Sequence, residues 1–287
     1  MQLNISIHSD IIEKYLIKRK EFKKTPLDYN LVSIIENPFN KIVISKKYLG
    51  FLDEVFTPDS ELYNDYSTFM TYLIDGKSEI VESNNSKSID DELEHISNSC
   101  NTATVAIFEN SHKQNRKIRT YLCLDKVGDC PKSKVFLGLL KDRKAIVRYN
   151  DFDSNATLKV FFNEIFNLPR NVSSTTIIER YANTNHSYFD FFEKNKILVK
   201  YYKHRATISD GNTLKGKFKR IELYNTTNGE LIHERLIVLG NLIINLDEDP
   251  MNLDVSRKTW TITITYSYDE AQNLLKKCND FAKVGFI

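Results

Sequence analysis

The stretch that decides the fold is Leu231–Ile264, LIHERLIVLGNLIINLDEDPMNLDVSRKTWTITI. It holds two apolar runs on either side of Gly240-Asn241, and from Trp260 onward Thr alternates with Ile. The Gly240-Asn241 pair predicts a turn, Asn228-Gly229 just before the stretch predicts a hairpin turn, and strict alternation predicts a half-buried strand. We therefore expect the second half of the chain to be a sheet built around this stretch.

The same stretch contains candidate anion-binding residues. His233 and Arg235 are two residues apart, so they share one face of the predicted strand. Arg257 leads into the alternating strand that starts near Trp260. Arginine binds phosphate through its planar fork of N–H donors, so this pattern indicates an anion site.

Length and composition favour a globular protein of two domains. The chain has 287 residues, of which 41% are hydrophobic. We expect an α/β fold with domains at 1–168 and 169–287, divided at Leu168-Pro169, where proline stops a helix. No apolar run approaches the roughly 18–20 residues of a membrane span, and the N-terminus has no signal-peptide layout, so we expect a cytoplasmic protein without integral membrane association. The four cysteines form no CxxC pair, which predicts free thiols.

Charge is strongly segregated along the chain. Residues 53–94 contain twelve acidic residues against Lys77 and Lys87, whereas residues 194–220 contain nine basic residues against Asp210. Residues 112–148 are also basic, with eleven lysines and arginines against three aspartates. Such segregation suits an enzyme that acts on a polyanion, although solvated charged faces would produce the same pattern.

Periodicity predicts alternating strands and helices in the first half. Expected strands are 2–7, 41–45, 104–108, 119–125 and 144–149, and expected helices are 30–36, 46–56, 63–74, 90–99 and 156–166, with a helical start after Asp10 and a loop at 82–88. In the second half, strands are expected at 175–181, 197–204, 218–224, within 231–246 and at 259–267, helices at 188–193 and 269–283, and a loop around 210–216.

Four acids occupy recurring positions in the first half. Asp10 follows the first strand, Glu54 lies on the helix after KIVIS, Asp90 or Asp91 opens the helix at 90–99, and Glu109 ends TVAIF. A hydrolytic Mg²⁺ or Mn²⁺ site needs several converging carboxylates. Each acid also has an ordinary structural explanation, as a helix cap, a first-turn acid or a solvated helix face.

The order of these acids resembles that of PIN-domain nucleases, over about residues 1–150. The resemblance implies a Mg²⁺- or Mn²⁺-dependent nuclease acting on RNA or single-stranded DNA. Asp10, Glu54, Asp91 and Glu109 would then be the catalytic and metal-binding residues, and the cations after the fourth strand would contact the substrate backbone: Lys113, Arg116, Lys117 and Arg119. The chain departs from the family pattern where Ile11-Ile12 follow Asp10 and where Glu109 replaces the usual Asp.

The second half resembles phospholipase-D-like domains of the type found C-terminal to MIT domains. TTIIERYANTNHSYFDFF matches that family's opening with Glu179, Tyr181 and His186, and two later segments match it with His233, Glu234, Arg235, Arg257 and Thr259. The resemblance implies phosphate binding by His186, His233, Arg235 and Arg257. Catalytic members use H-x-K-x₄-D, whereas this chain has Arg235 for the Lys and Gly240 for the Asp.

Three functional hypotheses follow. The first is a PIN-like nuclease whose phospholipase-D-like domain binds phosphate groups, nucleic acid or a partner, by analogy in a toxin or phage-defence system. The second is a non-catalytic binding subunit of a multi-subunit complex, in which the Arg235 region recognises an anionic ligand or partner protein. The third is a homodimeric phospholipase-D-type nuclease using His233, whose cleavage would resist EDTA.

Overall fold

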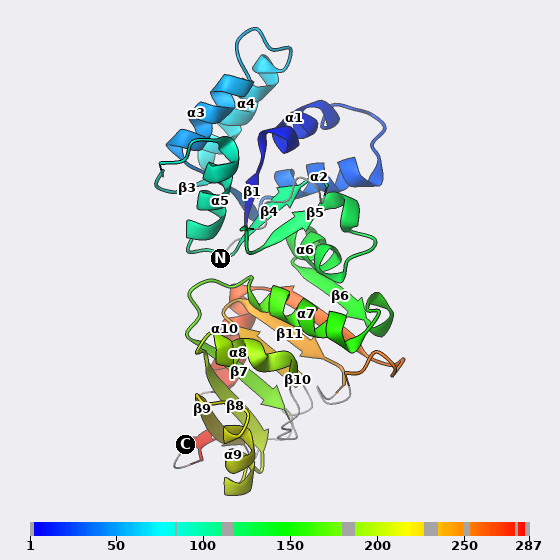
Figure 1. Cartoon of the computed structure of the whole chain (residues 1–287), viewed down its shortest axis with the longest axis vertical. Helices are drawn as coiled ribbons and strands as arrows, with labels where there is room; N and C mark the ends of the chain where they lie inside the picture. The colour runs from blue at the N-terminus through cyan, green and yellow to red at the C-terminus, as the bar shows by residue number, and fades with distance from the viewer. Residues whose placement is uncertain are drawn as a thin grey trace. The chain divides into compact units, whose positions relative to one another are not determined.

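The chain folds into two compact α/β units, Met1–Asp142 and Arg143–Ile287, in the computed structural model shown in Figure 1. The structure describes residues 3–83, 85–110, 117–179, 187–226, 235–248, 253–278 and 281–284. The first unit contains a five-stranded parallel sheet and the second an eight-stranded mixed sheet, which confirms the predicted fold class. None of the described helices has the length and apolarity that a membrane crossing requires.

The first unit alternates strands and helices. Its strands are β1 (Leu3–Ile7), β2 (Asn40–Ile44), β3 (Ser78–Ile80), β4 (Thr104–Phe108) and β5 (Tyr121–Cys123). Its helices are α1 (Ser9–Lys18), α2 (Pro26–Glu36), α3 (Lys46–Val55), α4 (Tyr63–Tyr72), α5 (Ile89–Ser99) and α6 (Pro131–Asp142).

All five strands of this unit are parallel, in the order β3-β2-β1-β4-β5. Helix α5 packs against the central strands and against α3, whereas α2 packs against α1 and α6. Every residue of β1 and β4 is buried, as expected for parallel strands covered on both faces. The central strands are therefore buried in the core, and the residues that directly follow them start from well-defined backbone positions.

Two elements of the first unit were not expected. Strand β3 is short and polar, so it gives little periodic signal at the sheet edge. Helix α6 buries Val135, Phe136, Leu139 and Leu140, a helical spacing that starts one turn after Pro131. This helical spacing was visible in the sequence, within the basic segment at residues 112–148.

The second unit has eight strands and four helices among its described residues. The strands are β6 (Lys144–Arg148), β7 (Ser174–Glu179), β8 (Leu198–His204), β9 (Ile221–Thr226), β10 (Arg235–Leu239), β11 (Leu242–Leu246), β12 (Thr261–Tyr266) and β13 (Ala282–Lys283). The helices are α7 (Asn155–Phe166), α8 (Asp190–Lys194), α9 (Ile208–Lys215) and α10 (Tyr268–Cys278).

Strand β6 moves the unit boundary to Asp142–Arg143 from the expected Leu168-Pro169. It pairs antiparallel with β12, with Ile262 opposite Val147, and so completes the second sheet. The full order of that sheet is β13-β9-β8-β7-β10-β11-β12-β6. A pairing between strands this distant in sequence leaves no local signal, whereas the proline at 169 does.

The connection between β8 and β9 contains α9 and not the expected loop. Because β8 and β9 are parallel neighbours, the chain must cross back between them, usually through a helix. Thr207 caps α9 in a reciprocal capping box with Asp210, although Gly211 and Gly216 suggested a loop. The last expected helix, 269–283, ends earlier at Cys278.

Aromatic side chains form the core between α7, α8 and the sheet. Phe166 lies 4.7 Å from Phe192 and 6.1 Å from Phe189 between ring centroids, and Phe162 lies 5.5 Å from Tyr188. Helix α10 packs on a separate cluster that includes Tyr202, Leu236 and Val238. Figure 1 shows α7 and α8 on one face of the sheet and α10 on the other, so both faces are covered. These aromatic residues belong to the buried core of the second unit.

The turn predicted at Gly240-Asn241 is present and joins β10 and β11 as a hairpin, with Leu239 paired to Leu242. The hairpin turn predicted at Asn228-Gly229 lies outside the described residues. Gly240 has φ +60°, and a Cβ there would lie 3.3 Å from Val172 Cγ2. We expect Gly240→Ala to lower the free energy of unfolding by roughly 1–3 kcal/mol, because this turn favours glycine at its first central position. Urea denaturation followed by circular dichroism measures the change.

Gly50→Ala is the matched control. Gly50 lies in α3, and no atom lies within 4 Å of the position that an alanine methyl would take there. Alanine should therefore stabilise the helix by roughly 0.5–1 kcal/mol. Equal effects of the two substitutions would show that the hairpin does not depend on the φ of Gly240.

Candidate functional site

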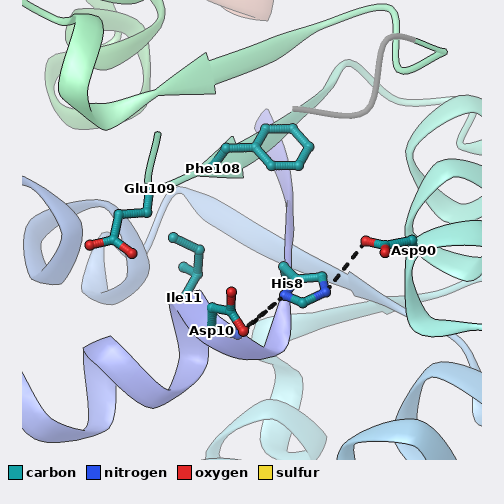
Figure 2. A pocket seen from close by; sticks show the side chains of 6 residues that line it. All are labelled: His8, Asp10, Ile11, Asp90, Phe108 and Glu109. Atoms are coloured by element: carbon teal, nitrogen blue, oxygen red, sulfur yellow. Dashed lines mark hydrogen bonds and ion pairs between the residues drawn. The ribbon is translucent and has the colours of Figure 1, made fainter. Parts of the chain in front are cut away.

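A cavity lies where the chain diverges from the middle of the first sheet. Strands β1 and β4 are parallel neighbours, but β1 leads to β2 on one side and β4 leads to β5 on the other. Ligands of open α/β sheets bind at such a point, outside the carboxyl ends of the strands. The cavity has a volume of about 250 Å³ and is lined by His8, Asp10, Ile11, Asp90, Phe108 and Glu109 (Figure 2).

His8 connects the acids on one side of this cavity. Its Nδ1 accepts the backbone N–H of Asp10 and so caps α1, which assigns the ring proton to Nε2. Nε2 lies 3.4 Å from Asp90 Oδ1, and Nδ1 lies 3.4 Å from Asp10 Oδ1. Figure 2 shows the ring between the two carboxylates. The start of α1 and the start of α5 are thereby held together.

Lys14 forms an ion pair with Glu109, the acid on the other side of the cavity. Its Nζ lies 2.9 Å from Glu109 Oε1 and 3.6 Å from Asp28 Oδ1. Burial alone would raise the pKa of Asp28, but hydrogen bonds from Thr25 and the Lys14 ammonium together hold that pKa below its usual value. An ionised, buried Asp28 thus anchors Lys14, which in turn orients Glu109.

A buried carboxylate fixes the first turn of α5. Glu92 is fully buried, and its two oxygens accept hydrogen bonds of 2.5 Å from Ser45 Oγ and from Ser86 Oγ. Ser45 follows β2 and caps α3, so this network ties the carboxyl end of β2 to the start of α5. Asp90, two residues before Glu92, takes its position from this anchor.

The structure brings together only part of the predicted acidic set. Asp10 and Glu109 line the cavity, but the contribution from α5 is Asp90 and not Asp91, which lines a different cavity with Glu94 and Lys117. Successive helical residues point about 100° apart, so only one of the two aspartates can face the site. Glu54 is exposed on α3, eight residues or about 12 Å along a helix that runs away from the carboxyl ends of the strands.

Of the predicted substrate-binding cations of the first unit, the two that the structure describes, Lys117 and Arg119, do not line the cavity. Lys117 lies 3.6 Å from Glu94, and the backbone N–H of Arg119 donates to Asn98 near the end of α5. Because β5 is parallel to β4, the connecting chain must return to the opposite end of the sheet before β5 begins. Lys113 and Arg116 lie outside the described residues.

In the second unit, Arg235 is the first residue of β10, an interior strand of the mixed sheet. Leu236 is opposite Ile178, which puts Arg235 at the end of β7 where Glu179 pairs with Lys203 of β8. The Arg235 guanidinium donates to the backbone carbonyl of Asp247. Arg257 is exposed in the turn before β12. His186 and His233 lie outside the described residues.

His8, which lines the cavity, and Lys14, which pairs with Glu109, were not predicted as site residues. His8 directly follows the first strand, and Lys14 is one helical turn after Asp10. Asp90 was one of two alternatives at the start of its helix, beside the chosen Asp91. The i, i+4 spacing of Asp10 and Lys14 puts them on one helix face and was a usable signal. No signal in the sequence indicated that His8 caps the helix, because histidine is an unusual N-cap residue.

The described residues of the first unit offer too few protein ligands to hold a metal ion by themselves. Among the described residues, no three His, Cys, Asp or Glu side chains lie close enough to hold a metal ion. Mg²⁺, however, is usually held by one or two carboxylates, with waters and substrate phosphates completing its shell. The carboxylates of the cavity therefore match a cation shared between protein and substrate, and not a preformed protein cage.

A second, more open hollow of the first unit contains a buried lysine. Lys77 is 7% exposed, and its Nζ donates to the backbone carbonyl of Asn37. Burial disfavours the ammonium and lowers the pKa of Lys77 to about 8, against a smaller opposing effect of Glu36. The same side chain titrates near 10.5 when the chain is unfolded.

Lys77 therefore predicts a pH-dependent stability. Between pH 8 and 10.5 the unfolded chain holds a proton that the folded chain has released, so the Lys77 contribution to stability improves as pH rises. We expect the advantage of Lys77→Met over the native protein, in free energy of unfolding, to be largest below pH 8 and to shrink by about 1–3 kcal/mol by pH 10.5. Parallel urea titrations at several pH values measure it, and a constant difference would contradict the lowered pKa.

Comparisons with known proteins give no family assignment. No protein-family model and no curated protein matches the chain. Among solved structures, the chain is similar to NucT from Helicobacter pylori (8% identity, 50% of this chain and 98% of that chain, TM-score 0.36). It is also similar to Nuc from Salmonella typhimurium, a phospholipase D family member (12% identity, 49% and 97%, TM-score 0.36).

A further similar structure is TrmBL2, an archaeal chromatin protein (12% identity, TM-score 0.30), with 50% of this chain covering 54% of that chain. This chain thus spans about half the length of TrmBL2.

Proposed function

We propose that the first unit is a Mg²⁺- or Mn²⁺-dependent phosphodiesterase that cuts RNA or single-stranded DNA. The observation that carries the proposal is the convergence of Asp10, Asp90 and Glu109, from three separate segments, on one cavity at the switch point of a parallel sheet. Carboxylates at this position are suited to hard cations and to phosphate-bearing substrates. The parallel strand order and the acid after β1 also agree with the resemblance to PIN domains.

Asp10 and Glu109 would hold the cation, with Asp90 at the side of the cavity reached by His8. A bound Mg²⁺ or Mn²⁺ would supply Lewis-acid stabilisation of the charge that develops on the phosphodiester. Lys14 orients Glu109 through their ion pair and would place a positive charge next to the substrate position. The His8 ring lies between Asp10 and Asp90, with one ring nitrogen 3.4 Å from each carboxylate.

The proposal is tested by cleavage of labelled RNA and single-stranded DNA oligonucleotides by the full chain. We expect cleavage with Mn²⁺ or Mg²⁺ and none with EDTA, together with a rise in melting temperature on adding Mn²⁺ to the protein alone. Absence of both effects would contradict a metal-dependent enzyme. Cleavage that persists in EDTA would instead indicate the phospholipase-D-type reaction at His233.

A second candidate function is anion binding without catalysis by the second unit. It is favoured by Arg235. The pairing of β10 with β7 and of β7 with β8 brings Arg235 to the same end of these strands as Lys203. This candidate predicts that inorganic phosphate raises the melting temperature of the native protein but not of Arg235→Gln. It fails if phosphate affects both proteins equally.

A further inference from the structure

The opposite end of the mixed sheet bears a concentrated group of basic side chains, which we call the basic patch. Its cations come from α7, from the end of α8 and from the turn that leads into β9: Lys159, Lys194, Lys196, Lys217, Lys219 and Arg220. Two hydrogen bonds hold these segments side by side. The backbone N–H of Lys219 donates to Glu193 at 2.6 Å, and the Arg220 guanidinium donates to the carbonyl of Lys196 at 3.1 Å.

Only part of this charge is neutralised. Asp190 forms ion pairs with Lys159 at 2.7 Å and with Lys217 at 3.0 Å, and Glu193 is the other acid in the patch. The four other cations of the patch, Lys194, Lys196, Lys219 and Arg220, are exposed, and within the described part of the chain none of them forms an ion pair. Four unneutralised cations on two adjacent segments create a strong local positive potential.

The backbone of the patch holds these cations in fixed positions. Lys196 has φ +55°, a left-handed conformation that favours Gly or Asn after a helix, yet this position carries a lysine. The carbonyl of Lys196 anchors Arg220, whose own carbonyl accepts the N–H of Val199 in β8. The guanidinium is therefore partly immobilised before any ligand binds, which reduces the entropy lost on binding.

We infer that the basic patch binds the phosphate backbone of a single-stranded nucleic acid. A membrane surface is the less suitable anionic partner, because interfacial binding also requires a face of exposed apolar anchors, whereas Val160 is the one large apolar side chain exposed in the described segments that carry the patch. The two short basic segments present their charges side by side, as a linear polyanion requires. This inference is independent of the proposed function, because the acidic cavity lies in the other unit and binding here needs no metal.

The test is fluorescence anisotropy of a labelled 20-nucleotide oligo-U RNA with the full chain, in EDTA, over a salt series. Four phosphate contacts predict a slope of log affinity against log salt of about −3. The double variant Lys196→Gln/Lys219→Gln removes two contacts but no side-chain bond described above. It should bind about 10-fold more weakly, with a slope shallower by about 1.4.

The matched control is Lys276→Gln/Lys277→Gln on α10, which removes the same charge from exposed positions on the other face of the sheet. It should bind RNA within about twofold of the native affinity. Equal losses in the two double variants would overturn the inference. So would binding to phosphatidylserine vesicles, through Lys196 and Lys219, in a protein that does not bind the RNA.

Discussion

Asp10→Asn is expected to lower Mn²⁺-dependent cleavage of RNA or single-stranded DNA by roughly 10³-fold or more. The substitution keeps the shape of the side chain but removes one of the charges that line the cavity. Metal-ion stabilisation of transition-state charge is worth several kcal/mol, and each 1.4 kcal/mol is about tenfold in rate. The same variant should lose the Mn²⁺-induced rise in melting temperature, because it lacks a carboxylate that binds the metal while its fold is unchanged. Single-turnover cleavage and thermal shift measure the two effects.

Asp91→Asn is the control for this prediction. It removes a carboxylate one residue from Asp90, but from the side of α5 that faces Glu94 and Lys117. Its cleavage rate and metal response should match those of the native protein, although a sequence-based choice would have mutated it first. If Asp91→Asn abolished cleavage and Asp10→Asn did not, the cavity at the switch point would not be the active site.

Trp260→Ala should cause the largest loss of stability, roughly 3–5 kcal/mol. The Trp260 ring is fully buried, packs 5.7 Å from the ring of Phe152 between centroids, and donates from Nε1 to the carbonyl of Asp254 at 2.8 Å. Alanine removes the apolar volume and leaves the Asp254 carbonyl without that donor. Urea denaturation followed by circular dichroism is the measurement, because the chain has a single tryptophan and the variant lacks it.

Trp260→Phe separates the two contributions. It retains most of the packing and removes only the N–H donor, so a loss of about 1–2 kcal/mol is expected. Equal losses for Ala and Phe would show that the hydrogen bond to Asp254, and not packing, dominates at this position.

The sequence predicts the fold better than it predicts the site. Buried strands such as KIVIS and TVAIF, and the turn at Gly240-Asn241, were evident because apolar runs and turn residues are local signals. The β6–β12 pairing was not evident, because two segments more than one hundred residues apart meet only in the folded sheet. The unit boundary was therefore placed too late.

Only some residues of the candidate site could be predicted, because some follow from local signals and others depend on the folded structure. Asp10 and Glu109 follow strands directly, so the parallel sheet brings them to one edge whatever the details of the loops. The choice between Asp90 and Asp91 depends on the rotation of α5, which Glu92 sets through Ser45 and Ser86. Glu54 was wrongly placed because its helix extends away from that edge.

The most direct test of the central claim is the anomalous scattering of Mn²⁺ in crystals of the full chain. We predict a peak in the cavity within about 2.0–2.6 Å of carboxylate oxygens of Asp10 and Glu109, and no such peak in Asp10→Asn crystals. An empty cavity in crystals that show Mn²⁺ bound elsewhere on the protein would contradict the assignment.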